Sequence, residues 1–544
     1  MVFSKQNILV FLFFIIGLSI SKAQIKTFTH QDSLRGSITP ERDWWDLKAY
    51  RLHIQPNPED NTVKGMNRIV FEQISSPKRM QIDLQEPMQI DSVLYKKGNL
   101  EYQREGNVYW LTFKNPMQGL DSIDIYFSGK PKISSNPPWD GGLTWTKDSS
   151  GKDFYTTSVQ GEGASLWWPC KDHMYDEVEE MDIFLTTAKD LKGIANGRLA
   201  ETISEGEQKT YHWQVKNPIN NYGVNMNVGN YVNFSEIYQG LNGPLTCNYY
   251  VLEENKAKAE EQFKQVSQML EAFEYWFGPY PFYEDSFKLV EVPYLGMEHQ
   301  SSVTYGNNYQ NGYRGRDLSG TGWGLKFDFI IIHESGHEWF ANNITNKDIA
   351  DMWIHESFTA YSESLFLEYY YGKKAGQEYV RGTRKNILND RPIIGTYHVN
   401  QSGSGDMYYK GANMLNSLRT QLNNDTLWRE ILIGLNKKFY HRTVNTEEIE
   451  SFLCSKSKLD LNVFFDQYLR TTKVPVLEYQ IEENTLSYRY TNTLDGFNLP
   501  IVLEINGIKT EIAPKKDWTS RSIQEPIKAI DFDPNYFVKY LKIN

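Results

Sequence analysis

Two histidines and an adjacent glutamate form the pattern with the clearest chemical meaning in this sequence. His333 and His337 stand four positions apart, and Glu334 directly follows the first histidine. On a helix this spacing places both imidazoles on one face, one turn apart, where they can share one zinc ion. The carboxylate beside them can take a proton from metal-bound water. Apolar residues flank the pattern on both sides, which disfavours a surface helix with unrelated histidines.

A catalytic zinc ion needs a third protein ligand, and the sequence offers Glu356 for it. A third histidine six positions after His337 is excluded, because Asn343 stands there and Phe340 replaces the accompanying glycine. Glu356 follows His337 by 19 residues, in a segment with helical periodicity. His355 is a rival ligand, but a neighbour on a helix points about 100° away, so only one of the two can face the metal. The predicted cofactor is therefore one zinc ion per chain.

The elements that must position these residues change character along the chain. From about residue 44 to 245, apolar and polar residues alternate with period two, which predicts half-buried strands. After residue 247, apolar residues recur at helical spacing to about residue 472. Within that stretch, Asn445 with Glu448 three positions later predicts a helix start. Asn506-Gly507 between two apolar runs predicts a hairpin in a strand-rich tail.

A chain of 544 residues with 40% hydrophobic residues is long enough for several domains with proper cores. We predict a multidomain α+β protein. The expected segments are a signal peptide (1–23), a polar lead-in (24–43), an N-terminal β domain (44–246), a zinc-bearing, mostly α catalytic domain (247–474) and a small C-terminal β domain (475–544).

The N-terminus and the overall charge limit where the protein acts and what it binds. Lys5 precedes an apolar run from Ile8 to Ile20, and Ser21-Lys22-Ala23 follows it. This order predicts a signal peptide cut after Ala23, hence export to the periplasm or the extracellular space; an uncleaved anchor is the alternative. We expect no transmembrane segment after cleavage. The net charge of −11 argues against a nucleic-acid partner.

The three cysteines, Cys170, Cys247 and Cys454, stand far apart and lack the spacing of a thiolate metal site. We expect all three to be buried small hydrophobic residues rather than metal ligands. The metal must therefore be held by histidine and carboxylate. The sequence does not determine the oligomeric state.

The combined pattern resembles the zinc aminopeptidases related to aminopeptidase N, a gluzincin metallopeptidase family that also includes leukotriene hydrolase. The spacing from His337 to Glu356 matches that family. Gly296-Met297-Glu298-His299 resembles the family's Gly-x-Met-Glu-Asn segment, with histidine in place of asparagine. The resemblance implies that Glu298 binds the α-ammonium group of the substrate and that Gly296 and Met297 belong to the same substrate-binding strand.

Two further segments are similar to those of the family. Tyr408-Tyr409-Lys410-Gly411 resembles its Tyr-x-Lys-Gly, which implies that Tyr408 donates a hydrogen bond to the oxyanion, with Tyr409 as a competitor. Gln160 stands nine residues before Pro169, where the family carries glutamate or glutamine as a second contact to the substrate N-terminus. Glu162 is close enough to be the alternative contact.

The resemblance covers roughly residues 44 to 475. It implies a saddle-like N-terminal β-sheet domain and a thermolysin-like catalytic domain, with hydrolysis of the first peptide bond of peptides that have a free N-terminus. A secreted zinc endopeptidase is one alternative, since it shares the zinc chemistry and needs no amine anchor. Another is an inactive envelope protein that binds peptide or carbohydrate. The pairs Trp44-Trp45 and Trp167-Trp168 could serve as sugar platforms, although such aromatic residues more often belong to the core.

Overall fold

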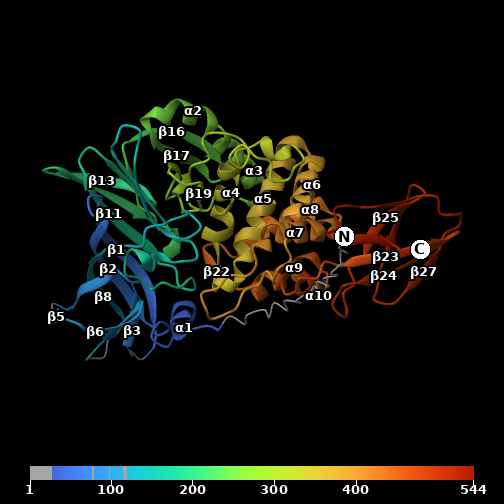
Figure 1. The fold of residues 1–544 in the computed structure, drawn as a ribbon, viewed down its shortest axis with the longest axis horizontal. Coiled ribbons are helices and arrows are strands. Elements are labelled where there is room, and N and C mark those ends of the chain that lie inside the picture. Colours follow the sequence, from blue (N-terminus) through green and yellow to red (C-terminus); the bar gives the residue numbers. More distant parts are fainter. Residues whose placement is uncertain (1–26, 76–78, 97, 114–118, 544) are drawn as a thin grey trace, which may run out of the picture.

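The computed structural model describes residues 27–75, 79–96, 98–113 and 119–543. The predicted signal peptide, residues 1–23, lies outside the described residues. The remaining chain runs from a sheet-rich region through a helical region to a second, smaller group of strands (Figure 1). This order confirms the predicted fold class. Within the described ranges, no helix is both long and apolar enough to span a membrane.

The N-terminal region is built on an eight-stranded sheet with the strand order β13-β14-β11-β1-β2-β8-β4-β5. Its long strands alternate buried and exposed side chains, as the period-two pattern predicts; in the first strand Tyr50, Leu52 and Ile54 are buried. The strands of this sheet are β1 (Trp45–Asn57), β2 (Thr62–Gln73), β4 (Gln89–Tyr95), β5 (Gly98–Asn99), β8 (Leu120–Gly129), β11 (Glu180–Ala188), β13 (Arg198–Glu205) and β14 (Gln208–Val215).

Two smaller sheets complete this region. A three-stranded sheet has the order β3-β7-β6, and a four-stranded sheet has the order β12-β15-β10-β9. Their strands are β3 (Arg79–Asp83), β6 (Glu101–Glu105), β7 (Val108–Thr112), β9 (Gly142–Lys147), β10 (Asp153–Ser158), β12 (Lys192–Ile194) and β15 (Asn227–Gly229). The paired tryptophans Trp44, Trp45, Trp167 and Trp168 are at most 1% exposed and form part of the core. They offer no platform to a sugar.

A short helix, α1 (His30–Gly36), precedes the first strand, in the stretch that the sequence analysis treated as a polar lead-in. Thr29 and Asp32 close its N-terminus as a capping box. The fully buried Arg42 donates to the carbonyl oxygen of Leu34 at 2.8 Å and pairs with Asp83 of β3 at 2.7 Å. These contacts fix α1 against the N-terminal sheets.

The central region opens with a five-stranded sheet in the order β16-β17-β18-β20-β19. Its strands are β16 (Tyr231–Gly240), β17 (Gly243–Leu252), β18 (Phe287–Glu291), β19 (Gly296–Met297) and β20 (Val303–Tyr305). Strand β17 continues across the expected domain limit after residue 246 and pairs in parallel with β18. The domain limits therefore remain predictions, because one sheet joins residues from both sides of this point.

The helices follow, interrupted by a pair of short parallel strands, β21 (Ile344–Asn346) and β22 (Arg442–Val444). They are α2 (Lys256–Gln262), α3 (Gln265–Phe277), α4 (Phe329–Gly336), α5 (Trp353–Tyr371), α6 (Lys373–Gly382), α7 (Tyr409–Leu422), α8 (Asp425–Lys438), α9 (Thr446–Ser457) and α10 (Asn462–Leu469). Helix α9 begins with the predicted capping box of Asn445 and Glu448. The apolar faces of the helices share one large core with the five-stranded sheet.

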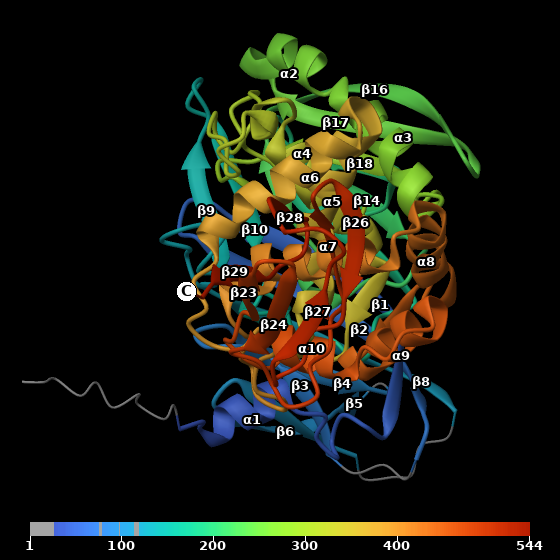
Figure 2. The same ribbon diagram turned by 90° about the vertical axis from the view of Figure 1, so that its right-hand side faces the viewer.

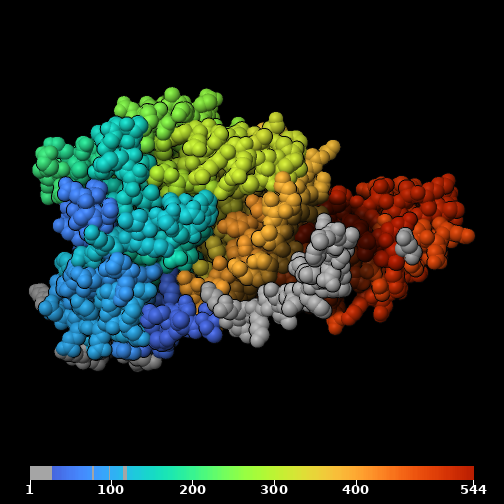
Figure 3. Space-filling model, viewed as in Figure 1, coloured from blue at the N-terminus to red at the C-terminus, as the bar shows by residue number. Residues whose placement is uncertain are grey.

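The C-terminal strands lie at the end of the molecule opposite the N-terminal sheet (Figures 1 and 2), and they project as a separate lobe in Figure 3. They form two sheets with the orders β27-β24-β23-β29 and β26-β25-β28. The strands are β23 (Val476–Glu482), β24 (Thr485–Thr491), β25 (Ile501–Ile505), β26 (Ile508–Ile512), β27 (Thr519–Ser522), β28 (Ile530–Phe532) and β29 (Lys539–Lys542). The predicted hairpin at Asn506-Gly507 joins β25 and β26.

Candidate metal centre and substrate site

Helices α4 and α5 carry the predicted metal ligands. Asp328 caps the N-terminus of α4, where its carboxylate accepts from the backbone amides of Ile330 and Ile331. His333 lies within α4, and His337 follows its last residue with helical backbone angles. Glu356 lies in the first turn of α5, which packs against α4. Two neighbouring helices thus bring residues from separate segments to one point.

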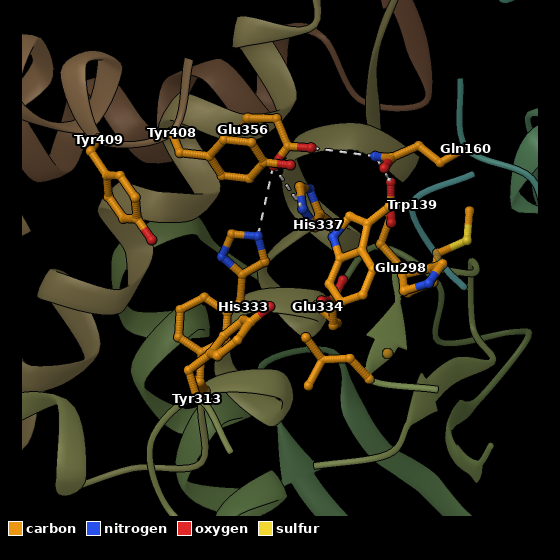
Figure 4. Close-up of a pocket in the computed structure, with 15 residues that line it drawn as sticks. Trp139, Gln160, Glu298, Tyr313, His333, Glu334, His337, Glu356, Tyr408 and Tyr409 are labelled. Carbon is orange, nitrogen blue, oxygen red and sulfur yellow. Dashed lines mark hydrogen bonds and ion pairs between the residues drawn. The ribbon is translucent and has the colours of Figure 1, made fainter. Parts of the chain in front are cut away.

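The three predicted ligands converge (Figure 4). One donor atom from each of His333, His337 and Glu356 lies within 4.8 Å of the other two. The Nε2 atoms of His337 and His333 are 3.4 and 3.7 Å from Oε2 of Glu356. All three side chains are buried. The two Nε2 atoms and Oε2 of Glu356 therefore surround a common centre, as ligands of one metal ion would.

The second nitrogen of each imidazole has a partner that sets its tautomer. Nδ1 of His333 lies 2.7 Å from Oε1 of Glu363. Nδ1 of His337 lies 3.0 Å from the carbonyl oxygen of Phe340 and 3.1 Å from the hydroxyl of Thr359. A proton on each Nδ1 satisfies these acceptors and leaves both Nε2 lone pairs free to bind a metal ion.

A divalent cation fits this cluster. Oε2 of Glu356 is buried and has no hydrogen-bond partner among the described residues, which is costly unless something else satisfies it. Burial alone would raise the pKa of Glu356, but the two imidazoles hold it well below its usual range. Two imidazole nitrogens and one glutamate oxygen are a ligand set typical of catalytic zinc. The donor set and the orphaned oxygen therefore both agree with zinc.

Glu334 points into the same space. Its carboxylate accepts no hydrogen bond from any described residue, although the residue is only 9% exposed. Burial raises the pKa of Glu334 to about 7. The nearby imidazoles of His333 and His337 lower this pKa, whereas the carboxylates of Glu298 and Glu356 raise it further. A carboxylate with a pKa near neutrality is well suited to accept and return a proton.

Glu298 and Gln160 lie together on the opposite side of the cluster from Tyr409 (Figure 4). Nε2 of Gln160 donates to Oε1 of Glu298 at 2.6 Å and to Oε1 of Glu356 at 3.3 Å. Burial raises the pKa of Glu298, and the neighbouring Glu356 adds to the effect. Glu162, the alternative to Gln160, instead forms an ion pair with Lys132 at 3.6 Å and does not line the cavity. The structure therefore places Gln160, not Glu162, beside Glu298.

Strand β19 brings Glu298 close to helix α4 because Gly296 allows it. A Cβ atom at Gly296 would lie 2.7 Å from a methyl carbon of Ile330 and 2.9 Å from the carbonyl oxygen of Thr304. Met297 is 2% exposed and packs in the core of the N-terminal region while also lining the cavity. These two residues fix the strand that Glu298 directly follows.

Of the two candidate tyrosines, Tyr408 faces the metal cluster. Its ring lies 5.9 Å from that of His333, and burial together with the carboxylates of Glu356 and Glu298 raises its pKa far above the usual value. For Tyr409, burial raises the pKa above its usual value, and the charges of Glu363 and Tyr313, rather than those of Glu356 and Glu298, add to the effect. Figure 4 shows Tyr408 beside Glu356 and Tyr409 farther away.

His355, the rival ligand, points away from the cluster. Its Nε2 accepts from the backbone amide of Asn346 at 2.9 Å, and burial lowers its pKa to about 3. His299, which replaces the family's asparagine, is also buried, and its Nδ1 lies 3.3 Å from the hydroxyl of Thr304. Neither histidine reaches the metal centre.

All nine residues that the sequence analysis assigned to the site line one cavity of about 350 Å³. The cavity also contains side chains that the sequence analysis did not single out, among them Trp139, Tyr313 and Phe329. Glu363, which orients His333 from outside the cavity, was missed as well. It stands seven residues after Glu356, two turns along the same face of α5, and that spacing is a signal that could have found it.

The sequence is similar to a peptidase family model and to curated aminopeptidases. Residues 261–468 match the model of the Peptidase family M1 domain. The chain is 19% identical over 446 residues to Probable aminopeptidase 1 of Sulfurisphaera tokodaii, covering 76% of this chain and 54% of that protein. It is 20% identical over 411 residues to Leucyl aminopeptidase of Saccharolobus solfataricus, covering 71% of this chain and 51% of that protein. The chain thus spans about half the length of the curated relatives it matches.

A solved structure shares the fold. The M1 zinc metallopeptidase from Deinococcus radiodurans is similar to this chain with a TM-score of 0.63 and 20% sequence identity, over 76% of this chain and 91% of that chain. The matched family segment contains His333, His337 and Glu356 as well as Glu298 and Tyr408. The match to the Peptidase family M1 domain therefore covers the segment that carries the candidate metal ligands.

Proposed function

We propose that this chain is a zinc-dependent aminopeptidase that hydrolyses the first peptide bond of peptides with a free N-terminus, with one zinc ion per chain. The observation that carries the proposal is the position of Glu298 next to the metal cluster. Donor atoms of Glu298, Glu334 and His337 lie within 4.8 Å of one another. The carboxylate of Glu298, which can bind a cation, therefore lies close to the Glu334 and His337 atoms that would take part in hydrolysis.

The size of one amino acid explains why this distance matters. In a peptide, the α-nitrogen and the carbonyl carbon of the first residue are roughly 2.5 Å apart. An ammonium group paired with Glu298 therefore brings the first carbonyl group, and no later one, to the centre between His333, His337 and Glu356. A fixed carboxylate is well matched to an ammonium group, since charge-assisted hydrogen bonds are short and strong.

His333, His337 and Glu356 would hold the zinc ion. Zinc, when bound, supplies Lewis-acid chemistry: it polarises a carbonyl group and makes water a stronger acid. Glu334 then accepts a proton from water and passes it to the nitrogen of the leaving amine. Tyr408 donates a hydrogen bond to the oxygen on which negative charge develops, an interaction worth about 3 kcal/mol in comparable sites.

Endopeptidase activity is the main competing reaction. It would use the same imidazoles and Glu334 but would have to leave room for the chain that precedes the cleaved bond. Glu298 and Gln160 occupy that side of the cluster, and Gln160 already bridges Glu298 and Glu356. This placement supports the aminopeptidase. The inactive binding protein is less well supported, because the paired tryptophans are buried and Glu334 stands free.

We also propose that the protein is exported, with cleavage of a signal peptide after Ala23. The support is the order of a positive residue, an apolar run and small residues at the N-terminus. N-terminal sequencing of the secreted or periplasmic protein should then begin at Gln24. A mature protein that retains residues 1–23 would contradict this part of the proposal.

The activity is tested on purified protein with aminoacyl fluorogenic amides and matched N-acetylated amides. We expect hydrolysis of the free amides only, loss of activity with a zinc chelator, and recovery with one equivalent of zinc per chain. Metal analysis before and after chelation gives the stoichiometry. Activity that survives complete removal of the metal would rule out the proposed chemistry.

A further inference from the structure

An unpartnered tryptophan lies at the amine-binding end of the cavity. Trp139 is 57% exposed and lines the cavity. Its indole makes no ring contact, cation–π contact or hydrogen bond with any described residue. In Figure 4 it lies with Gln160 and Glu298 on one side of the metal ligands. An exposed apolar ring at the mouth of a reactive cavity is a candidate contact for a ligand.

The loop that carries Trp139 is held in place. The backbone amide of Trp139 donates to the carbonyl oxygen of Asn136 at 2.9 Å. The carboxylate of Asp140 accepts from the backbone amide of Ser135 at 2.7 Å and from its hydroxyl at 2.6 Å. Lys132 donates to the carbonyl oxygen of Asp140 and pairs with Glu162, two residues after Gln160. The backbone that carries the indole is thus held close to the segment that carries Gln160.

A second group of aromatic rings lies on the opposite side of the cluster. Figure 4 shows Tyr313 and Tyr409 on the far side of His333 from Gln160. The ring of Tyr313 packs edge-on against Phe329 at 5.3 Å, and Phe329 stacks on His333 at 5.0 Å. The metal ligands therefore lie between two walls of the cavity. One wall is Trp139, and the other consists of Tyr313, Tyr409 and Phe329.

Among the described residues that line the cavity, no charged side chain lies outside the metal and amine cluster. The charged or titratable groups of the cavity are the acids and imidazoles of the metal and amine cluster, together with tyrosine phenols. The acid next to Trp139, Asp140, does not line the cavity, and its carboxylate is engaged by Ser134 and Ser135. A substrate side chain at either wall therefore meets mainly apolar surface.

We propose that these two walls are two apolar subsites: Trp139 contacts the side chain of the first residue, and Tyr313 with Tyr409 contacts that of the second. The preferred substrates are then peptides with a large apolar or aromatic first residue. This inference rests on the proposed function, because it needs the α-amine at Glu298. In every amino acid except glycine, Cβ lies roughly 2.5 Å from the α-nitrogen, so the first side chain must begin at the amine-binding end.

Two series of dipeptides test whether the two walls contact different substrate side chains. One varies the first residue (Phe, Leu, Ala, Arg, Glu) before a constant alanine, and the other varies the second residue after a constant alanine. We expect the wild-type enzyme to prefer Phe and Leu over Ala at the first position by about tenfold or more in kcat/KM. In Trp139→Ala this preference should fall about tenfold, while the preference at the second position is unchanged.

Matched variants make the result specific. Tyr313→Ala should lower the preference at the second position and leave that at the first. Trp139→Phe should restore most of the first-position preference, since a ring remains. Trp518→Ala removes a tryptophan of the C-terminal lobe that is 39% exposed, and should change neither preference. Circular dichroism spectra and melting temperatures establish that each variant is folded.

The results that would overturn the inference differ from those that would overturn the proposed function. A wild-type preference for Arg or Glu at the first position contradicts apolar subsites. An equal loss of kcat/KM for every first residue in Trp139→Ala means that the loop has only a structural role. If no free-amine dipeptide is hydrolysed while an N-acetylated peptide is, the aminopeptidase assignment itself is wrong.

Discussion

Glu363 joins two buried side chains: one carboxylate oxygen lies 2.7 Å from Nδ1 of His333, and the other accepts a hydrogen bond of 2.5 Å from the hydroxyl of Tyr379. His333 is 5% exposed, and Glu363 and Tyr379 are each 1% exposed. The carboxylate therefore fixes the imidazole from behind, and the tyrosine fixes the carboxylate. This relay directs Nε2 of His333 toward the other two candidate ligands.

Replacing Glu363 should weaken metal binding without removing a ligand. In Glu363→Gln the imidazole loses a charged acceptor, and we expect zinc affinity to fall by about 10- to 100-fold. Competition with a chromophoric chelator measures the dissociation constant directly. Tyr379→Phe, which removes only the outer hydrogen bond, should have a smaller effect. An unchanged affinity in Glu363→Gln would show that the contact does not orient His333 for the metal.

The two adjacent tyrosines should differ in their effect on turnover. Tyr408→Phe removes a donor that faces the metal cluster, so we expect kcat to fall by about 100- to 1,000-fold with little change in KM. Tyr409→Phe keeps the ring and loses a phenol that lies farther from the metal ligands than that of Tyr408, so its kcat should stay within a few-fold of the wild type. Steady-state kinetics of both variants decide the assignment. Equal losses, or a larger loss in Tyr409→Phe, would reverse it.

Gly296 should be needed for the close approach of β19 to α4. In Gly296→Ala the added methyl group must displace Ile330 or the backbone at Thr304, which moves Glu298. We expect kcat/KM to fall by roughly 10- to 100-fold while the zinc content is retained. Gly405→Ala is the matched control, because a Cβ atom there has no heavy atom within 4 Å. If both variants behave like the wild type, the strand position is not critical.

The buried Lys288 should give the stability a distinct pH dependence. Burial lowers its pKa to about 7, which the carboxylate of Asp285 only partly opposes. In the unfolded chain the pKa is about 10.4, so between these values the unfolded state holds more protons and stability rises with pH. The slope for one proton reaches about 1.4 kcal/mol per pH unit.

In Lys288→Met the rise of stability with pH that comes from the Lys288 titration should be lost. Thermal melting between pH 7 and 9, with zinc saturating, should show a melting temperature that rises more steeply in the wild type than in Lys288→Met. The exposed Lys437→Met serves as the control and should follow the wild type. Parallel curves for all three proteins would contradict the expected titration of Lys288.

Local patterns in the sequence were sufficient to predict several elements of the fold. The capping box at Asn445 and Glu448 and the hairpin at Asn506-Gly507 depend on a few neighbouring residues, and the structure confirms both. The helix α1 was missed because its amphipathic pattern is only seven residues long. The limit predicted after residue 246 stays a prediction: β17 continues through it and pairs with β18, and strand pairing across a distance leaves no local signal.

The candidate site was predictable where spacing along one helix decides it. His333 and His337 share a helical face, so their convergence follows from periodicity. The contact between Gln160 and Glu298 joins residues 138 positions apart, and only the family resemblance pointed to it. Trp139 gave no signal at all, because the loop that carries it reaches the cavity through tertiary packing rather than through any local pattern.

In the proposed aminopeptidase, Glu298 anchors a free α-amine next to a zinc ion held by His333, His337 and Glu356. The most direct test compares one pentapeptide in free and N-acetylated forms, with products identified by mass spectrometry, for the wild type and Glu298→Ala. We expect the wild type to remove single residues from the free peptide and to ignore the acetylated one. Glu298→Ala should lose roughly 100-fold in kcat/KM on the free peptide while keeping its zinc. Rapid cleavage of the acetylated peptide by the wild type, or an undiminished rate in Glu298→Ala, would contradict the claim.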